Sequence, residues 1–289
     1  MIVSAIAALV VGAALATAGA TLQSVLRNPL AEPYMLGLVG GASLFTAVAM
    51  HFGLEGAGAF VLPVAAFMGS VFSLSLVCGI SYVASRRRGG EAFAGETVIL
   101  AGFVAGSFTG SMYMLVMSFA EPATFARLSK WLFGDLRSVR PAALSVAAVC
   151  AAAAFVAVYS QARALNALSL GETMARTLGV NVRRTRLVAL GAASLATAAS
   201  VALAGAIGFL GLVVPHVVRR LFGANHRAYL PLSALLGALF LLVAHEVAGR
   251  LPKELSAGVV CALCGSPFFL YLLCLRRGAE CPREGNVNA

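Results

Sequence analysis

The chain has 289 residues, of which 60% are hydrophobic and only 11% are charged. Soluble domains carry roughly 25% charged residues, so a chain this apolar is excluded from that class and is predicted to be a multi-pass membrane protein. The net charge of +10 is expected to hold loops on the cytoplasmic side. No basic stripe with interleaved aromatic residues indicates nucleic-acid binding.

Nine apolar segments follow one another along the chain. Their continuous Ala-, Leu- and Val-rich runs favour membrane-spanning helices over the alternating strands of a β-barrel. The seventh segment follows the sixth almost directly, and glycines at residues 204–208 predict a tight re-entry or a broken helix there. The predicted fold is an all-α, polytopic transmembrane helical bundle, with residues 1–289 as one transmembrane domain. The nine segments are 2–26, 34–52, 60–84, 97–119, 141–160, 186–206, 207–222, 229–249 and 257–275.

Basic residues are unevenly shared between the two sides of this bundle. If the loop with Arg27 is cytoplasmic, the inside loops hold 15 of the 21 Lys and Arg residues and the outside loops hold 6. Because basic loops stay in the cytoplasm, this bias places Met1 outside and the C-terminus inside. No basic residue precedes Arg27, so the first segment is predicted to be an integral span and not a signal peptide.

Few residues offer chemistry. The sequence contains no GxxxxGK[ST] motif, so ATP hydrolysis by a P-loop is not expected, and neither is any other enzyme activity. Cys261 and Cys264 form a CxxC pair inside a predicted helix and are interpreted as packing residues, with no metal and no cofactor. His245 and Glu246 are the best candidates for an ion-coupling pair, although their predicted place is near the outer end of a span.

Two polar stretches are predicted to be ordered. The outside stretch 121–140, with Trp131, fits an amphipathic helix at the membrane surface. On the inside, Ser169 and Glu172 form a capping-box pattern, Gly179 is placed to end the resulting helix, and a second short helix is expected to lead into the next span. Physical reasoning leaves two alternatives open for this inner stretch: a rigid knob that fits a partner's groove, or an ordinary basic loop.

The chain resembles the permease subunits of type II ABC importers for iron–siderophore complexes, haem and cobalamin. The resemblance is carried by long stretches: VGAALATAGATLQSVLRNPLAEPYMLGLVGGAS at 11–43, LSLGETMARTLGVNVRRTR at 168–186, VALAGAIGFLGLVVPHVVRRLFGANHRAYLPLSALLGA at 201–238 and ELSAGVVCALCGSPFFLYLL at 254–273. Residues 44–160 match mainly in hydropathy and in features such as WLFGDL.

The resemblance implies a multi-pass permease of the inner (cytoplasmic) membrane that works as a homodimer. Two copies of an ABC ATPase subunit would sit beneath it, and a periplasmic or lipoprotein substrate-binding protein would dock outside. Residues 161–186 would form a cytoplasmic coupling loop that contacts the ATPase. The residues that match the coupling motif are Gly171, Glu172, Arg176, Leu178, Gly179 and Val180.

On the outer side, Arg250 matches a basic position that meets acidic residues of the binding protein, and Lys253 is expected to add compensating charge. Members of this family usually have ten spans, and the chain shows nine. The first family span and the R-x-P-R docking pattern before the second are expected to be missing from this sequence. The competing classes are an ion-coupled secondary transporter that uses His245 and Glu246, and a non-transporting assembly scaffold.

Overall fold

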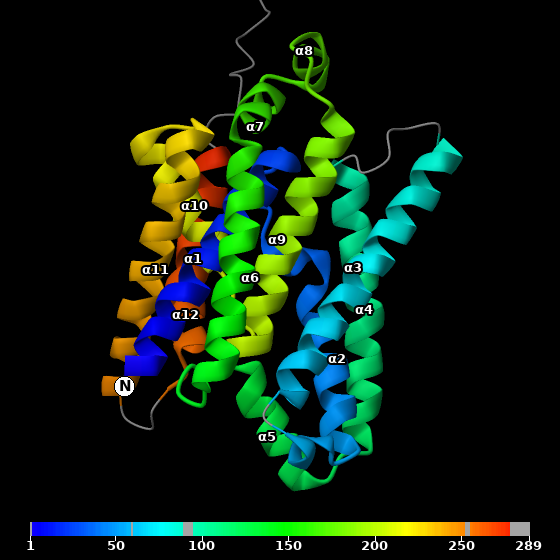
Figure 1. Cartoon of the computed structure of the whole chain (residues 1–289), viewed down its shortest axis with the longest axis vertical. Coiled ribbons are helices and arrows are strands. Elements are labelled where there is room, and N and C mark those ends of the chain that lie inside the picture. Colours follow the sequence, from blue (N-terminus) through cyan, green and yellow to red (C-terminus); the bar gives the residue numbers. More distant parts are fainter. Residues whose placement is uncertain (1, 59, 89–94, 252–254, 278–289) are drawn as a thin grey trace, which may run out of the picture.

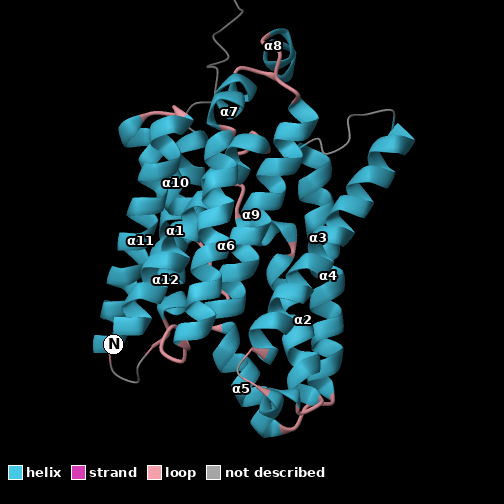
Figure 2. Ribbon diagram, viewed as in Figure 1, coloured by secondary structure: helices cyan, strands magenta, loops and turns pink. Residues whose placement is uncertain are grey.

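The computed structural model describes residues 2–58, 60–88, 95–251 and 255–277, and all regular structure in these ranges is helical (Figures 1 and 2). The 3-10 helices are η1 (Pro33–Leu36) and η2 (Leu54–Ala57). The α-helices are α1 (Ile2–Val25), α2 (Leu38–His51), α3 (Val61–Arg88), α4 (Gly95–Ser118), α5 (Pro122–Leu132), α6 (Pro141–Ser160), α7 (Ala162–Ser169), α8 (Glu172–Thr177), α9 (Val182–Ala204), α10 (Leu210–Phe222), α11 (His226–Arg250) and α12 (Ala257–Arg277).

Each of the nine predicted apolar segments overlaps one α-helix over most of its length. By length and composition, α1, α3, α4, α6, α9 and α11 can each cross a membrane, whereas α2 and the described part of α12 are shorter apolar helices. Helix α10 has only 13 residues. The all-α transmembrane bundle is therefore confirmed, but α2 and α10 fall short of the roughly 20 residues that a straight span needs.

Helices α1 and α9 form the centre of the bundle. In their most apolar 18-residue stretches, 56% and 67% of the residues are buried, compared with 17–28% in the other four long helices. Small residues allow this close packing, because backbones can approach where side chains are short. The hydroxyls of Thr17 and Thr21 donate to carbonyls one turn earlier in α1, so these buried polar groups are satisfied within the helix.

The two central helices belong to an internal repeat that the sequence interpretation missed. GAALAT at 12–17 in α1 corresponds to GAASLAT at 191–197 in α9. Each helix is followed by an irregular stretch and then by a short helix, α2 or α10. The sequence Leu-Gly-Leu-Val occurs in both halves, at 36–39 and at 210–213. The chain therefore uses the same long helix, break and short helix twice.

The break between α9 and α10 confirms the broken helix predicted at residues 204–208. Gly205 has φ 74° and Phe209 has φ 65°, so both lie in the left-handed region and end the α-helical path. The exposed amides are satisfied by the other half of the repeat. The amide of Ile207 donates to Tyr34 Oη at 2.6 Å, and the amide of Phe209 donates to Glu32 Oε1 at 2.5 Å. Residues of the first half of the repeat thus satisfy the break in the second half.

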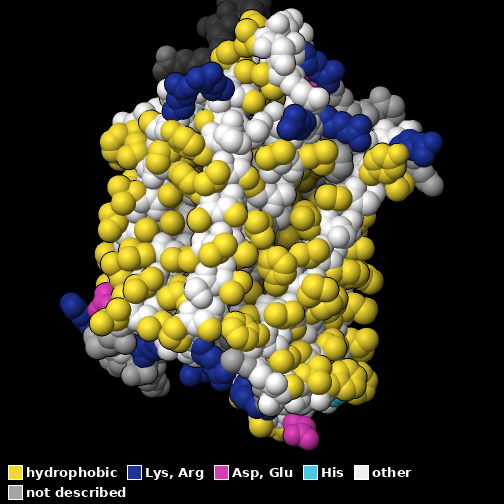
Figure 3. Space-filling view, in the orientation of Figure 1, with side chains coloured by type: hydrophobic (Ala, Val, Ile, Leu, Met, Phe, Trp, Pro, Cys, Tyr) yellow, Lys and Arg dark blue, Asp and Glu magenta, His cyan; other side chains and the backbone are white. Residues whose placement is uncertain are grey.

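The two ends of the bundle carry different short helices. Helix α5 lies at the same end as the N-terminus, while α7 and α8 extend from the opposite end (Figure 1). Hydrophobic side chains cover the band between the ends, and Lys and Arg side chains gather near both ends (Figure 3). The amphipathic helix expected in 121–140 is α5, which buries Thr124 and Leu128 and exposes Phe125 and Arg127.

The CxxC pair lies in α12. Cys261 is 1% exposed and belongs to the hydrophobic core, as the packing interpretation predicted, whereas Cys264 is exposed. Both are free thiols. Cys261 therefore acts in packing α12 against its neighbours.

The contact of α1 with α10 can be tested with one methyl group. A Cβ at Gly19 would lie 1.8 Å from the carbonyl oxygen of Gly211, so Gly19→Ala must push the two backbones apart. We expect a loss of about 1–3 kcal/mol, the usual cost of overpacking. Gly191→Ala is the matched control, because a Cβ there meets nothing within 4 Å. Thermal midpoints in detergent measure both, and equal midpoints would contradict the close contact.

Candidate functional site

The candidate site is the polar segment 161–186, called the coupling segment below. It consists of α7, α8 and the first residues of α9 at one end of the bundle (Figure 1). Its two ends continue directly into the long helices α6 and α9. A displacement of this segment would therefore act on two transmembrane helices at once.

The predicted capping box at the start of α8 is wrong. Ser169 is the last residue of α7, and its hydroxyl donates to the Asn166 carbonyl one turn earlier at 2.6 Å. The N-cap of α8 is Gly171, with φ 120°, a conformation that L side chains rarely adopt. Burial of Leu165 and Leu168 explains the difference, because packing of this face keeps α7 helical as far as Ser169.

Gly179 ends the α8 helical turn as predicted. Its φ of 78° is left-handed, and its amide donates to the carbonyl of Arg176 at 3.0 Å. The Val180 amide donates to the Ala175 carbonyl at 2.9 Å, and these two bonds together form a Schellman motif. A buried contact normally accompanies this motif, and here Val180 packs with Ala175. The end of α8 is therefore fixed by hydrogen bonds and by packing.

The second short helix expected after Gly179 does not exist as a separate element. Asn181 is an N-cap whose side chain accepts a hydrogen bond from the Arg184 amide at 3.0 Å. From Val182 the chain continues as one uninterrupted helix, α9, to Ala204. The extra short helix of the segment is α7, on the other side of α8. The second short helix of the segment thus precedes α8 instead of following it. After Gly179, α8 is joined directly to the central helix α9.

The inner face of the coupling segment is anchored to the bundle. Leu168, Ala175 and Val182 form a small buried cluster at the junction of the three helices. An ion pair between Glu172 and Arg186 fixes α8 to α9, and Arg186 is buried while Glu172 is partly exposed. Buried charges need partners because desolvation is costly. The segment is therefore a folded unit and not a loose loop.

The outer face of the segment is apolar and basic. Leu170, Met174 and Leu178 are 68%, 52% and 60% exposed, and the predicted coupling residue Arg176 is also exposed. Val180, expected to lie on this face, is instead half-buried in the inner cluster. Large exposed aliphatic side chains beside guanidinium groups offer a protein partner both apolar contact and charge.

At the opposite end of the bundle, Arg250 is exposed as the last residue of α11. Lys253 lies outside the described residues. Glu246 is exposed and His245 is half-buried about one turn before Arg250. His245, Glu246 and Arg250 line a polar trough together with Arg137 from the α5–α6 connection. The predicted ion-coupling pair therefore lies at the end of α11 and not at mid-span.

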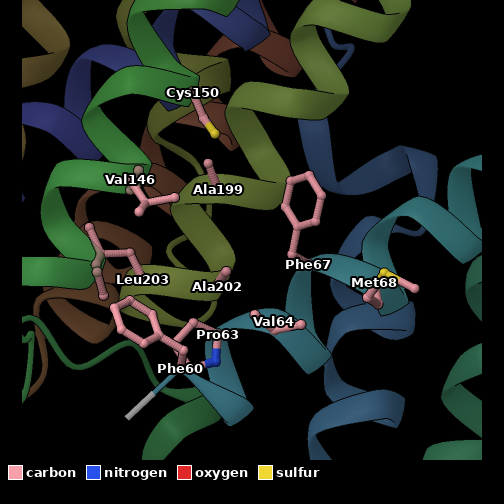
Figure 4. Close-up of a pocket in the computed structure, with 12 residues that line it drawn as sticks. Phe60, Pro63, Val64, Phe67, Met68, Val146, Cys150, Ala199, Ala202 and Leu203 are labelled. Carbon is pink, nitrogen blue, oxygen red and sulfur yellow. The ribbon is translucent and has the colours of Figure 1, made fainter.

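An apolar cavity of about 210 Å³ lies between α3, α6 and α9. Phe67 and Val64 reach into it from α3, Val146 and Cys150 from α6, and Leu203 from α9 (Figure 4). Its lining carries no charged side chain. Within the described residues, no group of three or more His, Cys, Asp or Glu side chains could hold a metal ion. The cavity accordingly suits an apolar group.

The sequence interpretation missed two groups of polar residues. One is Glu32 and Tyr34, which satisfy the break before α10. The other is Asn166 and His226, which are 60 residues apart and meet beneath α7. The NPLAEPY stretch at 28–34 and the residues NH at 225–226 border apolar segments, which was the only available signal. Nothing in their spacing indicated that they pair.

Comparisons with known proteins agree on one family. Residues 1–275 match the model of the FecCD transport family. The cobalamin import system permease protein BtuC of Halobacterium salinarum is 40% identical over 271 residues, covering 91% of this chain and 69% of that protein. The hemin transport system permease protein HmuU of Yersinia pestis is 36% identical over 275 residues, covering 93% and 80%.

A solved structure gives the same result. A metal-chelate type ABC transporter in an inward-facing conformation aligns with a TM-score of 0.83 and 28% identity, covering 94% of this chain and 86% of that chain. The helical bundle and these comparisons therefore define a multi-pass membrane permease of the ABC importer class. The chain belongs to the FecCD transport family.

The ion pair on the inner face can be tested by removing its carboxylate. Glu172→Ala leaves Arg186 without this partner, so we expect a loss of about 1–3 kcal/mol in the local stability of α8, below the value for fully buried pairs because Glu172 is partly exposed. Hydrogen exchange at the amides of 175–180 should become roughly tenfold faster or more. Glu96→Ala, an exposed carboxylate in the first turn of α4, is the control. Unchanged exchange in Glu172→Ala would show that the pair does not hold α8.

Proposed function

We propose that this chain is the permease subunit of an importer for a metal chelate, in the class of iron–siderophore complexes, haem and cobalamin. The names of its relatives support this substrate class, since they include a cobalamin, a hemin and an iron(3+)-hydroxamate permease. The observation that carries the proposal is the ordered coupling segment with an exposed apolar and basic face. The chain itself catalyses no reaction and takes its energy from separate ATPase subunits.

The coupling segment is the proposed contact with the ATPase. Leu178 and Arg176 would enter a groove of the ATPase from the outer face, while Gly171 and Gly179 set the ends of α8. Glu172 and Val180 act on the inner side, where they hold α8 against α9. We infer one segment per permease in a homodimer, so that two ATPase copies meet two segments.

The end of the bundle with Arg250 is the proposed docking surface for a substrate-binding protein. In this proposal the chain lies in the inner membrane and this end is on its outer side. Arg250 and Lys253 supply positive charge for acidic residues on that protein. Long-range attraction of this kind speeds association and weakens with salt. Residues 161–186 then lie in the cytoplasm, as the excess of basic residues in the inside loops indicates.

The test is uptake into proteoliposomes that contain the permease, its ATPase and the binding protein. Labelled haem, cobalamin and ferric chelates are offered in turn. Uptake should require ATP on the side of the membrane where the ATPase is bound. It should persist when a protonophore collapses the proton gradient. Transport that needs the gradient, needs no ATPase and is lost in Glu246→Gln would establish the secondary-transporter alternative.

Gly179→Pro should uncouple hydrolysis from uptake. Proline cannot adopt φ 78° and has no amide to donate to Arg176, so the Schellman motif is lost. We expect uptake per ATP to fall roughly tenfold, within the usual range of coupling energies. Gly179→Asn should remain close to wild type, since asparagine tolerates the left-handed region. Normal uptake per ATP in Gly179→Pro would exclude a coupling role for this end of α8.

Arg250→Glu should weaken docking of the binding protein. Reversing one exposed charge at the docking surface should slow association by roughly tenfold at low salt, and the difference should shrink as salt is added. Arg227→Glu, which is exposed at the opposite end of α11, is the matched control. The readout is the association rate on nanodiscs, and equal rates at low salt would remove Arg250 from the docking surface.

A further inference from the structure

A buried polar cluster lies where α7 meets the bundle. His226, the first residue of α11, is in contact with Asn166 of α7 and Ser24 of α1. Its ring Nδ1 lies 2.6 Å from Asn166 Oδ1, and its Nε2 lies 2.7 Å from Ser24 Oγ. Arg219 of α10 donates to the same Ser24 Oγ at 3.3 Å. These four residues are called the four-helix junction, because each comes from a different helix.

The chemistry of the junction fixes its orientation. An amide oxygen can only accept, so Asn166 Oδ1 receives hydrogen bonds from both the His226 backbone amide, at 2.9 Å, and the ring Nδ1–H. The Asn166 amide nitrogen donates to Asn225 Oδ1 at 3.0 Å. Asn166 is therefore held at both ends of its side chain by the beginning of α11. This arrangement ties α7 to α11 in a single geometry.

Burial makes the junction rigid. His226 is 1% exposed and Ser24 is 6% exposed, so water does not replace a partner that either of them loses, whereas Asn166 and Arg219 are half-buried. An unsatisfied buried polar group is costly, which penalises any motion of α7 that breaks these hydrogen bonds. Within the junction, the Arg219 guanidinium lies 4.9 Å from the centre of the Tyr229 ring and donates to Tyr229 Oη at 3.4 Å.

The hydrogen bonds continue from the junction into α10. Tyr229 Oη donates to Gln23 Oε1 at 3.4 Å, and Gln23 is the neighbour of Ser24. The Gln23 amide nitrogen donates to the carbonyls of Gly211 and Leu212, at 3.4 and 3.2 Å. These carbonyls belong to the first turn of α10, directly after the break at 205–209. A chain of polar contacts therefore joins the coupling segment to the broken helix.

We propose that the four-helix junction transmits displacement of the coupling segment to α1, α10 and α11, with Asn166 and His226 as positioning residues. The backbone connects the segment only to α6 and α9. The junction adds contacts with α1, α10 and α11, to which the backbone does not connect the segment directly. Movement of α7 then carries the first turn of α10 with it. This inference rests on the proposed function, because it assigns the ATPase as the source of the displacement.

The test compares variants in the reconstituted transporter. Asn166→Leu removes the acceptor that holds His226, while Asn166→Asp keeps an oxygen at that position. We expect Asn166→Leu to bind the ATPase and hydrolyse ATP within roughly twofold of wild type and to lose roughly tenfold in cargo moved per ATP, a coupling loss of common size. Asn166→Asp should recover most of the ratio. Ser145→Ala removes an exposed hydroxyl of α6 that donates to the Ala142 carbonyl within the same helix, and it should behave as wild type.

A second variant and a second readout protect the test against misfolding. Ser24→Ala removes the contact on the α1 side without changing α7 and should lower the same ratio. In wild type, nucleotide binding to the ATPase should alter hydrogen exchange in residues 211–216, and both Asn166→Leu and Ser24→Ala should reduce that response.

The outcomes separate this inference from the proposed function. If wild-type protein shows no ATP-dependent uptake, the proposed function fails. If wild type transports and both junction variants keep the normal ratio and exchange response, the inference is overturned. It is also overturned if the variants lose ATPase binding and thermal stability in parallel with uptake, without rescue by Asn166→Asp, because the junction would then be structural only.

Discussion

Backbone groups inside a membrane must find partners within the protein, and the break between α9 and α10 makes that constraint severe. The amides of Ile207 and Phe209 lie where a helix has ended and another has not begun. Tyr34 and Glu32 reach them from the break in the other half of the repeat. This arrangement requires α1 and α9 to run side by side, because the residues that follow α1 must reach the break that follows α9.

The coupling segment also depends on contacts with a neighbouring helix. Its short helix α8 would be unstable alone, since helices below about 12 residues are marginal in water. Gly171, the Schellman motif at Gly179 and the Glu172–Arg186 pair hold it on α9. Leu170, Met174 and Leu178 can then remain exposed without loosening the segment. Because the inner face holds the segment in place, the outer face is available for contact with a partner.

Much of the fold could be predicted from the sequence, because lipid imposes long apolar runs that are easily seen. The broken helix at 204–208 was also predictable, since glycine there has a direct conformational meaning. The capping box at Ser169 was wrong because burial of Leu165 and Leu168 outweighed a local hydrogen-bond preference. The contacts of Glu32, Asn166 and His226 could not be predicted, because they join residues far apart in sequence through packing that no local pattern encodes. The roles of Gly171, Arg176, Arg250 and Lys253 remain predictions.

The glycine contacts of α1 have a mechanical consequence. Gly12 lies against Gly237 of α11, and Gly19 lies against Gly211 of α10, with backbone meeting backbone. Interlocked side chains resist sliding, because one packed helix moves past another only when those side chains separate. The glycine contacts of α1 lack side chains of this kind. Along these contacts side chains do little to set the position of α1 relative to α10 and α11, so the hydrogen bonds of Gln23 and Ser24 near its end carry that role.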